Sequence, residues 1–319
     1  MPAPKCSEAE FIQMFESLGA KGAGEALGMS EPHIYARRRA IEKRIGRSLN
    51  SPNDTYRKSL IYDGAHHPGR IHFDIENGTA LIGSDCHYWP GIVTTAHRAF
   101  VKFIKEHKPG LLILNGDVMD GASISRHPSI GWEDKPSVIQ EIEAAQERLG
   151  EIEDAAGRKC DLAWTLGNHD GRFETRLATV APEYAKVHGV HLKDHFSHRW
   201  QPCWSVEINN DVIVKHRFKS GIHAPHHNTM WAGKTIVTGH LHSQKVYPFT
   251  DYNGDRWGVD TGTMAEPYGP QFDYVEDNPR SWRSGFGLFT FHKGNLLQPE
   301  LVRVCGDGEV DFRGKMHRV

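Results

Sequence analysis

The sequence predicts an α/β protein with two packed sheets and a small helical domain at its N-terminus. From residue 71 onwards, short apolar strands alternate with helical patterns, and the stretch 243–304 is mostly strand and turn. Alternating strands and helices that are followed by further strands are typical of an α/β domain with two sheets. Residues 1–48 show only helical patterns, so we expect a helical module at 1–48, a linker at 49–70 and the main domain at 71–319.

Composition excludes several classes of protein. The 319 residues are 38% hydrophobic and 24% charged, which permits a packed core. A net charge of −2 excludes a uniformly basic nucleic-acid binder but allows a local basic patch. The five cysteines are odd in number and contain no CxxC pair, which favours free thiols in a reducing cytosol over a disulfide framework. No apolar run approaches the ~20 residues that span a bilayer, so we expect a cytoplasmic protein without a membrane segment.

The helical module is predicted to contain three helices. Apolar residues recur at helical spacing over 8–18, a short helical stretch follows at 23–27, and Gly28 then breaks the pattern. Ser30 is a suitable N-cap for a third helix, which is predicted over 31–45. The linker that follows is rich in Asn, Pro and Gly, with short order expected only around 60–62.

The main domain begins with a strand at 71–75, where apolar and polar residues alternate. Further apolar strands are predicted at 80–82, 111–114, 162–166, 212–214 and 235–237. Helical patterns occupy 97–106 and 137–156.

Acidic and histidine residues follow these strands in five segments. The segments are Gly83-Ser84-Asp85-Cys86-His87, Asn115-Gly116-Asp117-Val118-Met119-Asp120, Gly167-Asn168-His169-Asp170, His216, and Gly239-His240-Leu241-His242. The carboxyl ends of strands in an α/β sheet meet at a shared crevice, where such folds bind their ligands. The sequence therefore predicts that these side chains converge on one site.

In order, these segments read D-x-H, GD-x-x-D, GNHD, a lone His and GH-x-H. This set resembles the calcineurin-like metallophosphoesterase superfamily, and in particular its nuclease and phosphodiesterase branch. The resemblance implies a four-layer α-β-β-α sandwich of two packed mixed sheets. It also implies a metal-dependent phosphoric ester hydrolase.

The same resemblance implies a site for two divalent metal ions, with Asp117 as the bridging carboxylate. One ion would take Asp85, His87, Asp117 and His242, and the other Asp117, Asn168, His216 and His240. The mixture of oxygen and nitrogen ligands favours Mn²⁺, with Fe, Zn, Mg and Ni as alternatives. From the residues alone, the fourth segment stays open, because His223, His226 and His227 are nearby alternatives to His216.

The resemblance also assigns roles to two residues that are not ligands. Hydroxide held by the metals would attack phosphorus, and His169 would act on the leaving group as general acid or charge stabiliser. Asp120 would orient His169 by accepting a hydrogen bond from its other ring nitrogen. Arg126, His127 and Arg172 lie near the motif loops, where they could hold a phosphate, but a place on the solvated surface is favoured. Asp251, Asp255 and Asp260 are expected in surface turns.

The segment 23–34 resembles a helix-turn-helix, with Gly28 at the turn and a basic third helix. Residues that would contact DNA are Arg37, Arg38, Arg39, Lys43 and Arg44. The alternative is a helical appendage that serves packing or oligomerisation and has a solvated basic face.

A hydrolytic site joined to a DNA-binding module predicts a DNA nuclease or phosphodiesterase, bacterial or phage-encoded, with DNA as its partner. One alternative is a phosphomonoesterase, or a phosphodiesterase for cyclic nucleotides or other small molecules. The protein-phosphatase pattern of the superfamily is broken, because Gly121 follows Asp120 and Asp170 replaces a glutamate. A DNA-binding regulator without activity is a further alternative. The oligomeric state is left open.

Overall fold

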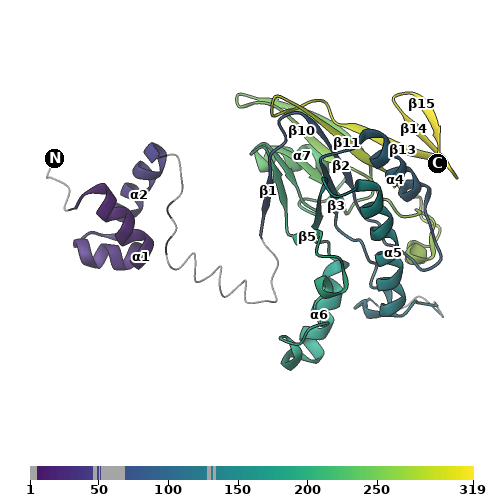
Figure 1. The fold of residues 1–319 in the computed structure, drawn as a ribbon, viewed down its shortest axis with the longest axis horizontal. Helices are drawn as coiled ribbons and strands as arrows, with labels where there is room; N and C mark the ends of the chain where they lie inside the picture. Colours follow the sequence, from purple (N-terminus) through teal and green to yellow (C-terminus); the bar gives the residue numbers. More distant parts are fainter. Residues whose placement is uncertain (1–5, 46–48, 50, 52–68, 128–130, 132–133) are drawn as a thin grey trace. The chain divides into compact units, whose positions relative to one another are not determined.

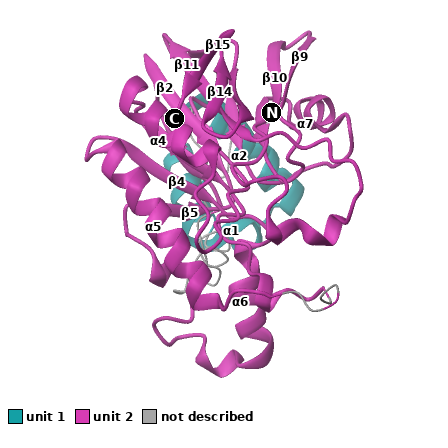
Figure 2. Cartoon of the chain, turned by 90° about the vertical axis from the view of Figure 1, so that its right-hand side faces the viewer, with its two compact units in different colours: residues 1–66 teal, residues 67–319 magenta. Residues whose placement is uncertain are grey.

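The computed structural model describes all residues except 1–5, 46–48, 50, 52–68, 128–130 and 132–133. The chain divides into two compact units, residues 1–66 and 67–319, which carry different colours in Figure 2. The predicted linker at 49–70 lies largely outside the described residues, as does the short order expected at 60–62.

The first unit has the three helical segments that the sequence predicts. Helix α1 (Glu8–Leu27) is broken at Gly19, where φ is 72°, and α2 spans Glu31–Ile45. Gly28 ends α1 in the left-handed conformation that glycine adopts without a steric penalty. A small core of buried apolar residues joins the helices: Phe11, Phe15, Ala23, Leu27, Ile34 and Ile41.

The second unit contains two mixed sheets (Figure 1). The larger sheet has the order β15-β14-β13-β11-β2-β3-β4-β5, with β12 paired to β11. Its strands are β2 (Gly78–Gly83), β3 (Leu111–Asn115), β4 (Asp161–Thr165), β5 (Trp200–Cys203), β11 (Gly285–His292), β12 (Asn295–Leu296), β13 (Glu300–Gly306), β14 (Glu309–Phe312) and β15 (Lys315–Arg318). Strands β2 to β5 run parallel, so their carboxyl ends share one edge.

The smaller sheet has the order β1-β6-β7-β8-β10-β9. Its strands are β1 (Ile71–Phe73), β6 (Val206–Ile208), β7 (Val212–Val214), β8 (Thr235–Thr238), β9 (Lys245–Asp251) and β10 (Gly254–Asp260). Strands β7 and β8 are parallel neighbours. Their carboxyl ends therefore also lie together.

Helices cover the outer faces of both sheets, which gives the predicted four layers. Helices α4 (Thr95–His107) and α5 (Val138–Ala156) lie on one side and α7 (Ala224–Ala232) on the other (Figure 2). Alternate strand residues face different layers. Leu81 packs toward α4 and α5, whereas Ala80 and Ile82 pack between the sheets.

Several elements differ from the prediction. Strand β1 ends at Phe73, and α6 (Asp170–Val180) was not predicted because it starts inside the GNHD segment. Helix α7 escaped detection because Pro225 and its histidines hide any apolar stripe. The remaining short helices are 3₁₀ turns at Ala122–Ile124, Pro182–Tyr184, Leu192–His195 and Pro270–Val275.

All five cysteines fall within the described residues, and none forms a disulfide, as predicted. No helix of the described part of the chain is long and apolar enough to cross a membrane.

Candidate metal centre

The predicted ligands come from the carboxyl ends of five strands in two sheets. Asp85 and His87 follow β2, Asp117 follows β3, and Asn168 follows β4. In the smaller sheet, His216 follows β7 and both His240 and His242 follow β8. Because the sheets pack face to face, these ends meet, and the structure brings all the predicted ligands together.

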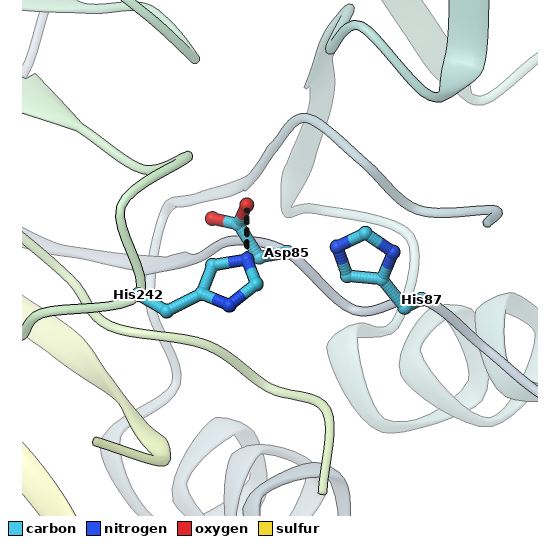
Figure 3. Close-up of side chains that lie close together, drawn as sticks. All are labelled: Asp85, His87 and His242. Atoms are coloured by element: carbon cyan, nitrogen blue, oxygen red, sulfur yellow. Dashed lines mark hydrogen bonds and ion pairs between the residues drawn. The ribbon is translucent and has the colours of Figure 1, made fainter. Parts of the chain in front are cut away.

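The first group of potential metal ligands is Asp85, His87 and His242, whose ligand atoms lie within 4.8 Å of one another. Figure 3 shows the two imidazole rings on either side of the Asp85 carboxylate. Nε2 of His242 is 3.0 Å from Oδ1 of Asp85. The ring of Phe272 packs edge-on against both histidines, at 5.0 Å from His87 and 5.5 Å from His242.

The Asp117 carboxylate belongs to a second group of potential metal ligands. Its Oδ2 lies 3.1 Å from Nε2 of His216 and 3.9 Å from Nε2 of both His87 and His169. His240 completes this group, with its ring 5.3 Å from that of His216. The lone histidine of the fourth segment that reaches the site is thus His216. Its alternatives, His223, His226 and His227, flank or lie on α7 and join no such group among the described residues.

The donor atoms fit a pair of divalent cations. Nε2 of His87 and Oδ1 of Asn168 are buried and have no hydrogen-bond partner in the described structure, and Nε2 of His216 faces the Asp117 carboxylate 3.1 Å away. The other ring nitrogen of each histidine is held, His87 Nδ1 by Asp120 at 2.8 Å and His216 Nδ1 by the Asn115 carbonyl at 2.8 Å. Such outer contacts leave the free nitrogen as the metal donor.

Electrostatics at the centre also favour bound cations. Although burial opposes it, Asp117 and Asp85 raise the pKa of His216 to about 10. Burial likewise opposes ionisation of Asp117, yet His216 and His169 hold the pKa of its carboxyl well below its usual range. The buried carboxylates therefore carry negative charge that a protonated imidazole, or a metal ion in its place, must balance.

Backbone strain concentrates at the predicted ligands. Five of them have φ in the left-handed region, with 53° at Asp85, 39° at His87, 51° at Asp117, 71° at His240 and 56° at His242. This conformation is uncommon for residues with a Cβ and costs roughly 1–3 kcal/mol each. Strain of this kind persists at functional sites, where the surrounding packing imposes it.

Glycines of the motifs leave room for the ligands. A Cβ on Gly167 would lie 2.0 Å from Oδ1 of Asp117, and one on Gly116 would lie 2.3 Å from Nδ1 of His216. Both distances are far below van der Waals contact. The GN and GD segments therefore need glycine for close approach.

Asp120 and Arg172 surround His169. The Nδ1 of His169 lies 3.1 Å from the Asp120 carboxylate and 2.9 Å from the Asp120 carbonyl oxygen. Arg172 donates to the same carbonyl at 2.8 Å and lies 3.1 Å from Nε2 of His169. A guanidinium can only donate, so in this arrangement Nε2 accepts and Nδ1 carries the hydrogen. Asp117 and Asp120 raise the pKa of His169 in spite of the opposing effect of its burial.

Asp170 joins two of the motif loops. Its buried carboxylate accepts from the backbone N–H of Asp117, Val118, Met119 and Gly167, and from Nε1 of Trp164. Burial raises the pKa of Asp170 to about 6. The residue thus holds the GD-x-x-D loop against the GNHD loop.

A cavity of about 520 Å³ opens beside the centre. Its walls include Asn168 and His169 on one side, Trp89 and Tyr274 as aromatic surfaces, and Arg172 as a cation. Arg172 is half-buried, so the expectation of a solvated surface residue was wrong. Its spacing from the GNHD segment, one helical turn past His169, is the signal that could have placed it.

A model of the calcineurin-like phosphoesterase family matches residues 79–262. The chain belongs to the calcineurin-like phosphoesterase family. As a calcineurin-like phosphoesterase it is a metal-dependent phosphoric ester hydrolase, and its clustered ligands suit the divalent metals that the family uses.

Several solved structures align with this calcineurin-like phosphoesterase at low identity. Vps29 from Entamoeba histolytica in complex with zinc shares 12% identity at a TM-score of 0.39, over 76% of this chain and 98% of Vps29. A dimetal phosphatase from Danio rerio shares 11% identity at a TM-score of 0.35, over 72% and 96% of the two chains. The nuclease MPE from Pseudomonas putida shares 14% identity at a TM-score of 0.26, over 69% and 86%. A search of curated proteins finds no match.

The three acidic residues predicted in surface turns differ in burial. Asp260 is fully buried and accepts from Ser243 and the Gly262 N–H, so its expected place in a surface turn was wrong. Asp260 is the last residue of β10, which lies between β8 and β9. Its burial was not predicted because acidic residues are usually exposed. Asp251 and Asp255 are exposed.

The five cations that were predicted to contact DNA divide into two kinds. Arg37 donates to the Cys6 carbonyl at 2.7 Å and lies over Phe11, Arg38 pairs with Glu42, and Arg44 pairs with Glu8. Arg39 and Lys43 are exposed and form no ion pair with any described residue.

Proposed function

We propose that this protein is a two-metal nuclease that hydrolyses phosphodiester bonds in DNA. The observation that carries the proposal is the combination, in one chain, of clustered potential metal ligands and a helix-turn-helix-like unit with exposed cations on its last helix. A DNA-binding module joined to a hydrolase of P–O bonds is most simply explained by a DNA substrate.

The metal ligands in this proposal are the residues that converge at the centre. Asp85, His87, Asp117 and His242 would hold one cation, and Asp117, Asn168, His216 and His240 the other. When bound, the two cations polarise the phosphoryl group and lower the pKa of water. The mixed oxygen and nitrogen donors favour manganese.

The chain's own residues would position the phosphodiester. Arg172, at the cavity wall beside His169, would donate to a phosphate oxygen in place of the His169 ring. His169, thereby released and protonated at both ring nitrogens, as its raised pKa favours, would donate from Nε2 to the leaving oxygen. Asp120 would hold the ring in that orientation through Nδ1.

The helical unit would recruit duplex DNA. Arg39 and Lys43 would contact phosphates, because both are exposed. Arg37, Arg38 and Arg44 would instead maintain the fold of the unit through the partners described above.

Cleavage of supercoiled plasmid in the presence of Mn²⁺ tests the proposal. We expect nicking by the full chain, its loss in Asp117→Asn, and a marked loss in a double variant with Arg39→Glu and Lys43→Glu. The matched control is Arg158→Glu with Lys159→Glu, which removes the same charge from an exposed part of the main domain. Plasmid that stays intact with every divalent metal would refute the nuclease.

A second candidate function is hydrolysis of a small phosphomonoester or phosphodiester. The cavity of about 520 Å³ beside the centre favours it, because this volume matches a small-molecule site. Turnover of small esters together with intact plasmid would support this function.

A further inference from the structure

The chain segment that supplies the histidines of the smaller sheet is free of acidic residues. Between residues 212 and 250 there is no Asp or Glu, whereas Lys215, Arg217, Lys219, Lys234 and Lys245 are present. The whole chain, by contrast, carries a net charge of −2. Because acidic residues are missing, this segment is net positive next to the metal ligands.

Exposed aromatic side chains alternate with these cations. Nζ of Lys219 lies 4.2 Å from the ring centroid of Trp231 on α7, and Nζ of Lys215 lies 5.0 Å from that of Phe218. Trp231 is 66% exposed and Phe218 is 43% exposed. We call Lys215, Arg217, Phe218, Lys219 and Trp231 the 215–231 surface.

The cations of this surface have no acidic partner among the described residues. Lys234 pairs with Glu207, and Lys245 donates to the Ile222 carbonyl at 3.0 Å. Lys215, Arg217 and Lys219, in contrast, form no ion pair with any residue that the structure describes. Their charge is available to an anionic ligand.

The surface is ordered and close to the metal ligands. The backbone N–H of Lys219 donates to Oδ1 of Asn228 at 2.9 Å, which fastens the loop to α7. Asn228 is itself buried. Lys219 is three positions after His216 in the chain, so their Cα atoms are at most roughly 11 Å apart.

We propose that the 215–231 surface binds single-stranded nucleic acid and guides it to the metal centre. This inference deepens the proposed nuclease function and rests on it for the choice of ligand. The lysines and Arg217 would contact phosphates, and Trp231 and Phe218 would stack with bases.

A single strand fits these features better than a duplex does. Grooves that bind single strands combine backbone-tracking cations with aromatic side chains on which unpaired bases stack. In a duplex the bases already stack on one another, which leaves exposed rings such as Trp231 without a partner. An anionic membrane also attracts cations and aromatic residues, so vesicles belong in the test.

Binding is best measured without hydrolysis, in full-length protein that carries Asp117→Asn. Fluorescence anisotropy would compare a labelled mixed-sequence single strand, the same sequence as a duplex, and competition by phosphatidylserine vesicles. We expect Trp231→Ala to weaken single-strand binding by roughly tenfold. Lys219→Ala should reduce the slope of log K against log salt by about 0.7, the value for one phosphate contact on a single strand.

Two matched controls separate this surface from general effects. Tyr252 is fully exposed but lies between Asp251 and Asp255, so Tyr252→Ala should leave single-strand binding unchanged. Lys159→Ala removes an exposed cation elsewhere and should not alter the salt slope. Thermal melting confirms that each variant is folded, as expected for exposed side chains.

The outcomes are distinct for the inference and for the nuclease. Single-strand binding that Trp231→Ala and Lys219→Ala leave intact, or loss only of duplex or vesicle binding, would overturn the assignment of this surface. Binding that depends on Trp231, in a wild-type chain that hydrolyses no phosphodiester with Mn²⁺, would refute the nuclease but uphold the surface. Plasmid cleavage by the wild type, together with single-strand binding that Trp231→Ala and Lys219→Ala do not weaken, would uphold the nuclease but refute the surface.

Discussion

The Asp120 carboxylate lies 2.8 Å from Nδ1 of His87, a predicted ligand, as well as 3.1 Å from Nδ1 of His169. The sequence assigned Asp120 to His169 alone. One buried carboxylate thus contacts both a predicted metal ligand and the residue predicted to act on the leaving group. Its contacts with the two rings keep the pKa of Asp120 low in spite of its burial.

Replacement of Asp120 by Asn should weaken metal binding and activity together. The neutral amide cannot accept from both rings as the carboxylate does, so His87 loses its fixed orientation. We expect Mn²⁺ affinity and hydrolysis of a small phosphodiester to fall by about 10- to 100-fold. Titration calorimetry and steady-state kinetics measure the two effects, with exposed Asp154→Asn as the control. Unchanged Mn²⁺ affinity would contradict the role of Asp120 toward His87.

Gly167→Ala should disrupt the metal centre, whereas Gly171→Ala should not. The added Cβ at Gly167 would lie 2.0 Å from Asp117 Oδ1, but nothing lies within 4 Å of a Cβ at Gly171. Since Gly171 is inside α6, alanine there should stabilise the helix by up to about 1 kcal/mol. Thermal melts and metal titrations of both variants check the contrast. Equal melting temperatures and metal affinities of the two variants would show that the GNHD loop can move to accommodate a Cβ at residue 167.

Asp170→Asn should lower the stability of the fold. In the wild type, several backbone N–H groups donate to the Asp170 carboxylate. In the variant, the NH₂ group of the amide would face some of these N–H groups, and donor would oppose donor. Hydrogen bonds to charged groups contribute roughly 1.5–3 kcal/mol each. We expect a loss of about 3 kcal/mol in the free energy of unfolding by urea, against no change in Asp154→Asn. A loss below the experimental error would mean that the two motif loops hold together without this carboxylate.

Glu141 should make stability depend on pH. Burial raises the pKa of its carboxyl from 4.5 to about 7, although it accepts from the Gly121 and Ala122 N–H groups. Between these values the folded state keeps a proton that the unfolded state has lost. The free energy of unfolding therefore falls as pH rises from 4.5 to 7 and stays reduced above that.

Glu141→Gln removes this titration. The decrease in the free energy of unfolding between pH 4.5 and 7 should therefore become smaller, by up to about 3 kcal/mol. Urea denaturation at a series of pH values measures it. Exposed Glu143→Gln on the same helix should keep the wild-type profile. A Glu141→Gln profile parallel to wild type would show that the Glu141 pKa is ordinary.

The strands and the order of the motifs could be read from the sequence because they are local. Strand 212–214 was predicted at the bounds the structure has, and β3, β4 and β8 differ by at most one residue at either end. Apolar runs that end in glycine, acidic residues and histidine are visible over a few positions. Helix α6 was missed because it starts inside the GNHD segment, and α7 was missed because Pro225 and its histidines interrupt any apolar stripe.

The sequence by itself determined the fold class, the family resemblance and the residue types that gather at the carboxyl ends of the strands. Only the tertiary structure decided that His216 meets Asp117, that Asp120 serves two rings, that Asp170 ties two loops, and that Arg37 turns into its own helical unit. These contacts join residues that are far apart in the chain. They depend on the packing of one sheet or helix on another, and short-range patterns carry no information about that packing.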